Sequence, residues 1–468
     1  MLSYRKLAMR VLGRPLHTGG SDSPRPASQR AAALILTAAM LTTLTAPAFA
    51  KEWYIEEGDI TVRAGETEGT NKVSQGENPE VEDTNTVITN SDKDKASSNT
   101  VTIEAKDKDD KVEVTLKDVN IDTSSRSEAA VSVTGEGNTN IELDGDNALK
   151  SDIYSSGISS SGSLTISGGE NDSLTAQGGS GADGIYSSGS LTISGGTVTA
   201  NGGSGGGGDG GDGIWSSGGV TISGGSTVTA NGGDGKDDYG GDGIRSDSGD
   251  VTISGGSTVT ANGGNGGNVS GDGIRSDSGD VTISGGTVKA AGGDSKDGYG
   301  GDGIRSGGVT ISGGTVNAAG GNGGKVGGYG ICSFARVAIS GGTVNAAGGN
   351  GKNSNGGSDG IISNDIDLSG SLELTAKAGR PNGKAISWAG HELDLDTIKD
   401  KLGPGAKVTA TDANGETKQV SSPIPRPVEP EEPEPVIPEE SSSSSDGGSA
   451  TPSAPASPLP GLTVTDKD

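Results

Sequence analysis

A repeat of about 30 residues constrains the fold of this chain more than any other feature. The segment GDGIRSDSGDVTISGGSTVTANGG, residues 241–264, returns thirty residues later as GDGIRSDSGDVTISGGTVKAAGG. A Gly-Ile pair marks each unit, and successive pairs are 27 to 30 residues apart. Short units of this kind cannot bury an apolar side alone, so neighbouring units must stack on one another. The repeat therefore predicts a solenoid.

Alternation within one unit predicts its strands. In the unit that starts at Asp242, apolar and hydroxyl residues alternate in three short segments separated by glycines. Period-two alternation is typical of strands with one buried face. The predicted inward residues are Ile244, Val251, Ile253, Val259 and Ala261. We therefore expect an all-β, right-handed parallel β-helix with about 30 residues per coil and with rungs about 4.8 Å apart.

One polar position recurs at the end of the third strand of each coil. It holds an asparagine in three successive coils and an alanine in the next three: Asn201, Asn231, Asn262, Ala291, Ala319 and Ala347. Stacked asparagines can bond amide to amide along a solenoid, which satisfies their polar groups. We expect a structural ladder here rather than a ligand site.

Changes in composition divide the chain into five expected segments. An apolar run that ends in Ala48-Phe49-Ala50 has the pattern of a secretory signal peptide. The tail is rich in Pro, Glu and Ser, which is typical of a disordered linker. The segments are a signal peptide (1–50), an N-terminal cap with irregular opening coils (51–150), regular coils (151–378), a C-terminal cap (379–421) and a disordered tail (422–468).

The C-terminal cap is expected to contain a short helix near 393–402 and a hairpin that turns at Asn414-Gly415. Such non-repeating ends cover the open edges of a solenoid.

Charge and cysteine content limit the partners and the compartment. The formal net charge of −27 argues against nucleic acid as a ligand, because that affinity comes largely from phosphate neutralisation. A single cysteine, Cys332, leaves no intramolecular disulfide. No transmembrane span is expected after residue 50. The chain is predicted to be secreted and extracellular, with association at a cell surface as an extension of that prediction.

Catalytic groups are scarce. After residue 50 the chain has one histidine, His391, in the predicted cap, and Cys332 has no evident catalytic partner. The Gly-rich inserts offer nothing to shape a water-excluding cleft. We expect no enzyme activity; the alternative is a β-helical polysaccharide lyase or hydrolase.

Two columns on the outer surface carry the candidate binding residues. The residue after each buried isoleucine faces outward, and in successive coils it is Tyr186, Trp215, Arg245, Arg275 and Arg305. Aromatic rings stack on sugars and arginines bind carboxylates, so this column predicts an acidic-polysaccharide site along the rod. The alternative is that these arginines pair with nearby aspartates such as Asp247 and Asp277.

The second column consists of the aspartates Asp183, Asp212, Asp242, Asp272 and Asp302. Like charges stacked at rung spacing repel unless a cation or an N–H group compensates. Ca²⁺ is therefore the one candidate cofactor, although the structural interpretation, a turn-forming Asp-Gly, is favoured over a metal site. A third outward pattern, the Thr-Val-Thr segments, occurs on ice-binding solenoids; here it decays after Thr258 and Thr260.

The sequence of the repeats is similar to that of a known family. GSLTISGGTVTANGG with its Gly-Ile phasing, the opening WYIEEGDITVRAGET and the stretch NTNIELDGDNALKS resemble secreted clostridial carbohydrate-binding-domain proteins. The resemblance covers roughly residues 51–420. It implies a right-handed parallel β-helix that binds acidic plant polysaccharide with calcium. It supplies no catalytic motif and no binding residue by position.

The sequence thus predicts a secreted or cell-surface, non-catalytic carbohydrate-binding protein for acidic polysaccharide. The alternative from another class is a structural surface protein or adhesin that binds a host or cell-surface protein. Ice binding and polysaccharide cleavage are less favoured.

Overall fold

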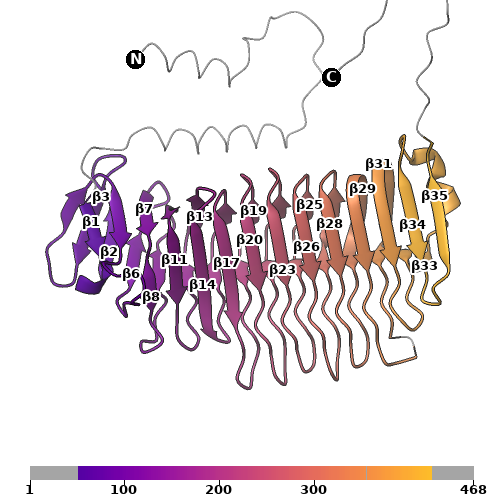
Figure 1. The fold of residues 1–468 in the computed structure, drawn as a ribbon, viewed down its shortest axis with the longest axis horizontal. Coiled ribbons are helices and arrows are strands. Elements are labelled where there is room, and N and C mark those ends of the chain that lie inside the picture. The colour runs from indigo at the N-terminus through magenta and orange to yellow at the C-terminus, as the bar shows by residue number, and fades with distance from the viewer. Residues whose placement is uncertain (1–50, 355, 424–468) are drawn as a thin grey trace, which may run out of the picture. The chain divides into compact units, whose positions relative to one another are not determined.

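The computed structural model describes residues 51–354 and 356–423, and these residues form a β-solenoid (Figure 1). The solenoid has about ten turns of about 29 residues, so the predicted all-β fold class is confirmed. Most strands pair in parallel with the strands one coil before and one coil after. The predicted signal peptide (1–50) and the tail from residue 424 lie outside the described residues.

Three stacks of parallel strands run along the solenoid and are called stacks A, B and C. Stack A contains β2 (Ile60–Ala64), β6 (Val101–Glu104), β9 (Val131–Thr134), β12 (Ile158–Ser160), β15 (Ile185–Ser187), β18 (Ile214–Ser216), β21 (Ile244–Ser246), β24 (Ile274–Ser276), β27 (Ile304–Ile311), β29 (Ile331–Ala347), β30 (Ile361–Ser363) and β32 (Ile386–Trp388). Stack B contains β1 (Lys51–Tyr54), β5 (Thr86–Thr89), β7 (Lys111–Lys117), β10 (Asn138–Asp144), β13 (Ser163–Gly168), β16 (Leu191–Ile193), β19 (Val220–Ile222), β22 (Val251–Ile253), β25 (Val281–Ile283), parts of β27 and β29, and β31 (Asp365–Lys377).

Stack C begins at Asn120, before the regular coils, and forms the front of the molecule in Figure 1. It contains β8 (Asn120–Asp122), β11 (Asp146–Lys150), β14 (Ser173–Ser180), β17 (Thr197–Gly203), β20 (Thr227–Asn231), β23 (Thr258–Asn262), β26 (Thr287–Ala291), β28 (Thr315–Ala319), the ends of β29 and β31, and β34 (Lys407–Thr411).

The core lies inside the three stacks and matches the predicted inward set. In the coil of β21, β22 and β23, the residues Ile244, Val251, Ile253, Val259 and Ala261 are all buried. Each has a partner of similar size one coil away, because the strands pair in register: Ile244 lies on Ile274, for example. Similar side chains at sheet spacing fill the interior without large voids, which is how a chain poor in aromatics builds a core.

The predicted asparagine ladder is present. Asn231 Nδ2 donates to Asn201 Oδ1 and Asn262 Nδ2 donates to Asn231 Oδ1, each over 2.8 Å. The alanine at position 291 follows Asn262 in the same register. The ladder therefore satisfies side-chain amides by stacking alone.

Antiparallel strands occupy both ends of the described solenoid. At the N-terminal end β3 (Asn71–Gln75) pairs with β2 and with β4 (Val81–Asp83), next to the 3-10 helix η1 (Ile55–Glu57). At the other end β33 (His391–Glu392) pairs with β32, and the 3-10 helix η2 (Leu395–Lys401) leads into a hairpin of β34 and β35 (Thr417–Ser421). In residues 51–354 and 356–423, no helix is long and apolar enough to cross a membrane.

The Gly-rich inserts are ordered, which the sequence did not predict. They join stack C to stack A and lie side by side along the lower edge of the molecule in Figure 1. We call this layer the glycine blade; it comprises residues 203–211, 232–241, 263–271, 292–301, 320–328 and 348–354. Parallel bridges link its loops from coil to coil, as in Gly205–Gly235–Gly266 and Tyr239–Val269–Tyr299.

Glycine is required in the blade because the two legs of each loop touch backbone to backbone. A Cβ on Gly235 would overlap the carbonyl group of Tyr239, and one on Gly266 would overlap that of Val269. The glycines therefore allow close packing rather than flexibility.

This packing predicts which glycines accept a methyl group. Gly235→Ala should lower the free energy of unfolding by about 1–3 kcal/mol, because the backbone must shift to admit the new atom. Gly207→Ala is the matched control, since a Cβ there meets nothing within 4 Å. We expect the control to unfold like the unaltered protein in chemical denaturation followed by circular dichroism. Equal stabilities of the two variants would contradict a closely packed blade.

Candidate functional site

Five buried aspartates form a ladder at the base of the glycine blade, just before the strands of stack A. We call Asp183, Asp212, Asp242, Asp272 and Asp302 the aspartate ladder; their exposed fractions are between 4% and 9%. Each Oδ1 accepts a hydrogen bond from the backbone N–H one coil further on, over 2.5–2.7 Å. The ladder ends where the N–H of Tyr329 donates to Asp302. Each carboxyl group thus satisfies a buried backbone donor.

Burial raises the pKa values of the aspartate ladder. The pKa rises to about 7 for Asp242 and Asp272 and to about 6 for Asp183 and Asp302. Loss of solvation is the main cause, and for Asp242 and Asp272 the carboxyl group of the next coil adds to it. The pKa of Asp212 also lies well above its ordinary value for these two reasons. The backbone hydrogen bonds and nearby arginines oppose the rise.

The predicted calcium role of these aspartates gains no support from this geometry. Within the described ranges, no group of three or more His, Cys, Asp or Glu side chains is placed to hold a metal ion. A Ca²⁺ site needs six to eight oxygen ligands around one point. The ladder instead spreads its carboxyl groups along a line and gives each one a backbone partner.

The predicted outward column is in register. Tyr186, Trp215, Arg245, Arg275 and Arg305 are successive partners in stack A, from β15 to β27. We keep the name outward column for these five residues. Their side chains are partly buried, and the three arginine side chains are 30–40% exposed.

Two of the arginines pair with aspartates, as the structural alternative predicted. Arg245 Nε donates to Asp247 over 3.0 Å and its Nη2 donates to Asp277 over 3.1 Å. Arg275 Nε donates to Asp277 over 2.6 Å, and its Nη1 lies 3.8 Å from the buried Asp242. An acidic ligand would have to compete with these carboxylates, so the middle of the outward column is largely neutralised.

Arg305 differs because its coil has Gly307 where the two previous coils have Asp247 and Asp277. Its nearest carboxylate oxygen is Asp302 Oδ2 at 3.9 Å, and its side chain is 40% exposed. The guanidinium lies 5.3 Å from the centre of the Phe334 ring, in a cation–π arrangement. Arg305 is therefore the arginine of the column best placed to meet an anionic ligand.

The aromatic pair at the other end of the column packs within the column itself. The rings of Tyr186 and Trp215 meet edge to face with centroids 5.2 Å apart. The Arg245 guanidinium lies over the Trp215 ring at 5.2 Å. The indole Nε1 is buried and has no hydrogen-bond partner among the described residues. This packing covers one face of the Trp215 ring, so that face is not available for the sugar stacking that the sequence predicted.

Two exposed aromatic side chains lie in the coils that follow the coil of Arg305. Phe334 and Trp388 are 54% and 48% exposed. Asn364 connects them, since its Nδ2 donates to the Phe334 carbonyl and its own carbonyl accepts from Trp388 Nε1 over 2.9 Å. We call Arg305, Phe334, Asn364 and Trp388 the aromatic corner. Sequence reasoning missed it, although Phe334, one of only two phenylalanines, replaces a small residue of the repeat.

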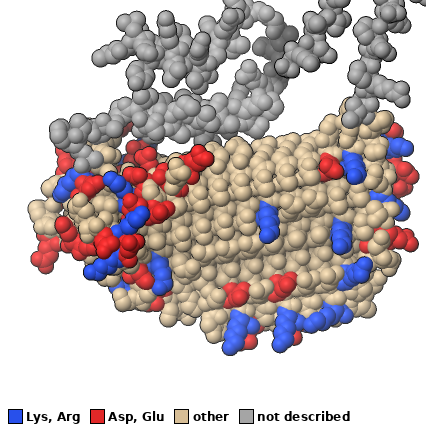
Figure 2. Space-filling model, in the orientation of Figure 1, with Lys and Arg blue, Asp and Glu red and all other residues tan. Residues whose placement is uncertain are grey.

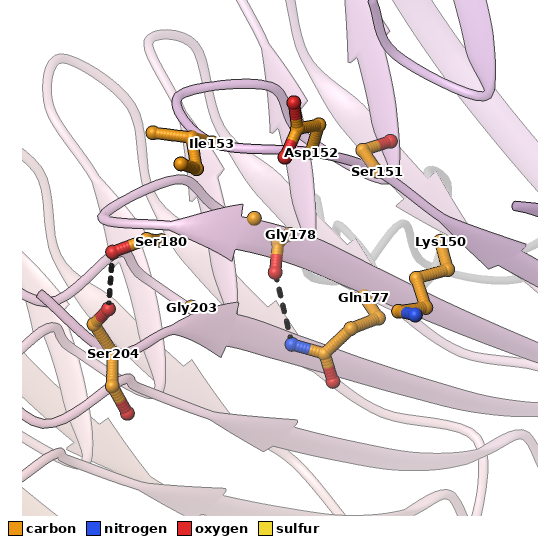
Figure 3. A pocket seen from close by; sticks show the side chains of 10 residues that line it. Lys150, Ser151, Asp152, Ile153, Gln177, Gly178, Ser180, Gly203 and Ser204 are labelled. Atoms are coloured by element: carbon orange, nitrogen blue, oxygen red, sulfur yellow. Dashed lines mark hydrogen bonds between the residues drawn. The ribbon is translucent and has the colours of Figure 1, made fainter. Parts of the chain in front are cut away.

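A surface hollow lies at the opposite end of the regular coils, where the blade begins (Figure 3). Its volume is about 550 Å³, and it is lined by Lys150, Ser151, Asp152, Ile153, Gln177, Gly178, Gly179, Ser180, Gly203 and Ser204. Lys150 is paired with Asp122 over 2.9 Å. Asp152 is the one carboxylate in the lining, so the hollow lacks the pair of carboxyl groups that most glycoside hydrolases use.

Cys332 follows Arg305 in the register of the outward column and is buried. Burial raises the pKa of its thiol to about 12, and nearby carboxylates add to the rise. The thiol is therefore protonated at neutral pH and is a poor nucleophile.

Comparison with known protein families supports the same architecture. Four segments match the Beta helix repeat family: 191–214, 220–244, 281–304 and 309–331. Each match runs from a strand of stack B through stack C and the blade to the next strand of stack A. The protein is thus a β-solenoid that contains β-helix repeats. Searches of curated proteins and of solved structures found no match.

The aspartate ladder predicts a pH-dependent stability. A carboxyl group with a raised pKa binds its proton more tightly in the folded protein than in the unfolded chain, where its pKa is near 3.8. Its stabilising contribution is complete below pH 3.8 and is lost as the pH rises through about 6–7. Thermal unfolding should therefore occur several degrees higher at pH 5 than at pH 8.

Asp242→Asn should reduce the difference in unfolding temperature between pH 5 and pH 8, because an amide oxygen can accept the same hydrogen bond without titrating. Asn265 and Asn322 already take such bonds in a neighbouring ladder. Asp237→Asn, at an exposed loop position, is the control for the change in charge. Calorimetry at pH 5 and pH 8 measures the effect, and an unchanged pH dependence in Asp242→Asn would contradict it.

Proposed function

We propose that this protein is an extracellular, non-catalytic carbohydrate-binding protein and that its ligand is an acidic polysaccharide. The observation that carries the proposal is the aromatic corner, where the accessible guanidinium of Arg305 lies over the exposed ring of Phe334 and the exposed ring of Trp388 follows two coils further on. Arginine binds carboxylates through paired N–H groups, and aromatic faces pack against the apolar faces of sugar rings. A uronic-acid residue carries a carboxylate and an apolar ring face, so it can make both of these contacts.

The scaffold supports the proposal by its rigidity and its direction. Arg305, Phe334, Asn364 and Trp388 come from four successive coils, so the aromatic corner follows the axis of the solenoid. A polymer that runs along this axis can contact several coils at once without the protein reorganising. Binding energy is then not spent on ordering flexible loops. The resemblance to secreted carbohydrate-binding-domain proteins agrees with this class of ligand and with an extracellular location.

A protein partner is the second candidate, because exposed Trp and Arg side chains are also typical of protein–protein hot spots. The two proposals differ in a direct measurement. A carbohydrate-binding corner distinguishes acidic from neutral glycans, whereas an adhesin surface is indifferent to both.

Removal of the aromatic corner should therefore weaken binding to an acidic glycan. Phe334→Ala and Arg305→Gln should each reduce affinity for polygalacturonate about tenfold, since each removes one central contact. Tyr154→Ala is the control, because this side chain is 85% exposed and lies at the other end of the regular coils. Calorimetric titration with polygalacturonate and with a neutral galactan gives the affinities.

Selective binding of polygalacturonate by the unaltered protein, with losses in the two corner variants only, is the expected result. Failure of the unaltered protein to bind either glycan would rule out the proposed function and favour a protein partner.

A further inference from the structure

A second hollow lies at the C-terminal end of the solenoid, where stack C meets the last loops of the blade. Its volume is about 310 Å³, and its lining consists of Ala347, Gly348, Asn350, Lys377, Ala378 and Arg380. The lining contains two cationic side chains and no carboxylate. We call it the basic hollow. It is separate from the outward column, which lies on stack A, and from the aromatic corner, which lies at the C-terminal end of stack A.

The two cations of the basic hollow are not neutralised by the protein. Lys377 and Arg380 are exposed, and neither forms an ion pair within 4.0 Å with any residue that the structure describes. This contrasts with Arg245 and Arg275, which share carboxylates at 2.6–3.1 Å. In a protein of net charge −27, a concave site with two unpaired cations is a local exception that favours an anionic ligand.

Backbone and side-chain contacts fix the wall of the hollow. Asn350 Oδ1 accepts a hydrogen bond from the backbone N–H of Arg380 over 2.8 Å, and Asn350 Nδ2 donates to Asn322 over 3.1 Å. Asn322 in turn accepts from the Asn350 N–H and donates to Asp294. The segment that carries Arg380 is thus bonded to a ladder that extends back through the blade. Pre-organised donors of this kind bind an anion with little loss of conformational entropy.

The surroundings extend the positive charge along the rod. Lys325 and Lys352, on the two preceding blade loops, are exposed, and their loops carry no Asp or Glu. Lys325 lies 5.7 Å from the centre of the ring of Tyr299, which is 49% exposed. Figure 2 shows several Lys and Arg side chains along the lower edge of this face with a few acidic side chains between them, whereas the densest group of Asp and Glu lies at the N-terminal end.

The geometry points to the basic hollow as a second binding site, which takes a carboxylate group of an acidic polysaccharide while the chain continues over Lys352 and Lys325. Arg380 supplies the planar N–H pair that matches a carboxylate, and Lys377 supplies a second charge. The alanines Ala347 and Ala378 leave a small apolar floor under a sugar ring. This inference rests on the proposed function, because it takes the same class of ligand, but it places the contact at a different edge of the solenoid.

The test compares two double variants with the same change in charge. Lys377→Gln with Arg380→Gln removes the cations of the hollow. Lys399→Gln with Lys401→Gln removes two cations from η2, outside the hollow. Each protein is titrated with polygalacturonate by calorimetry, and with monomeric galacturonate by observing amide shifts in NMR spectra of the full chain.

We expect the hollow variant to lose at least about tenfold in affinity for polygalacturonate and the η2 variant to lose less than twofold. Galacturonate should shift the amide signals of residues 347–350 and 377–380 in the unaltered protein and in the η2 variant only. Equal affinity losses in the two variants, or shifts elsewhere alone, would overturn the site. If the Arg305 and Phe334 variants lose affinity while the hollow variant does not, the proposed function stands without it. No binding by the unaltered protein would overturn both.

Discussion

The repeating features of this protein depend on parallel backbone pairing between coils. Because the strands pair in register, each side chain lies one sheet spacing, about 4.8 Å, from its equivalent in the next coil. A residue type therefore has to be compatible with copies of itself. Isoleucine, valine and alanine meet this condition in the core, and threonine meets it on the outer faces. Asparagine meets it by donating from one amide to the next. Charged residues do not meet it without help.

The aspartate and arginine columns show how the charges are accommodated. Repulsion between stacked carboxylates is reduced in two ways: each Oδ1 accepts a backbone N–H, and burial raises the pKa so that charge is partly removed near neutral pH. The arginines lie beside this ladder, and Arg245 and Arg275 each pair with the aspartate two residues further along the chain, Asp247 and Asp277. Two columns that would each be unfavourable alone therefore stabilise each other, and most of this charge is not available to a ligand.

The repeat was sufficient to predict the coils, but it did not predict the loops between the strands or the contacts on the surface. Period-two alternation placed Ile244, Val251 and Val259 correctly in the core, and the spacing of the units placed the outward column and Asn231 in the right register. The blade was missed because its order comes from backbone contacts between glycines such as Gly235 and Gly266, which leave no apolar pattern in the sequence. The pairing of Arg245 was foreseen only as an alternative, since the direction of a long side chain depends on neighbours in other coils. Both hollows depend on loop paths that composition does not encode.

Departures from the repeat are the best guide to function in a scaffold of this kind. Residues that keep the stack uniform are explained by the stack, and local choices that break its rules need another cause. Gly307 removes the aspartate that would neutralise Arg305, and Phe334 and Trp388 put large rings where other coils have small residues. Lys377 follows Ala347 in its column, and Arg380 ends a ladder of asparagine and aspartate side chains; neither cation has an ion-pair partner among the described residues. These departures all fall between residues 305 and 388, in the last coils and the start of the C-terminal cap. On the function proposed above, the regular coils act as a spacer of fixed length and direction, and the proposed binding surfaces lie at one end of it.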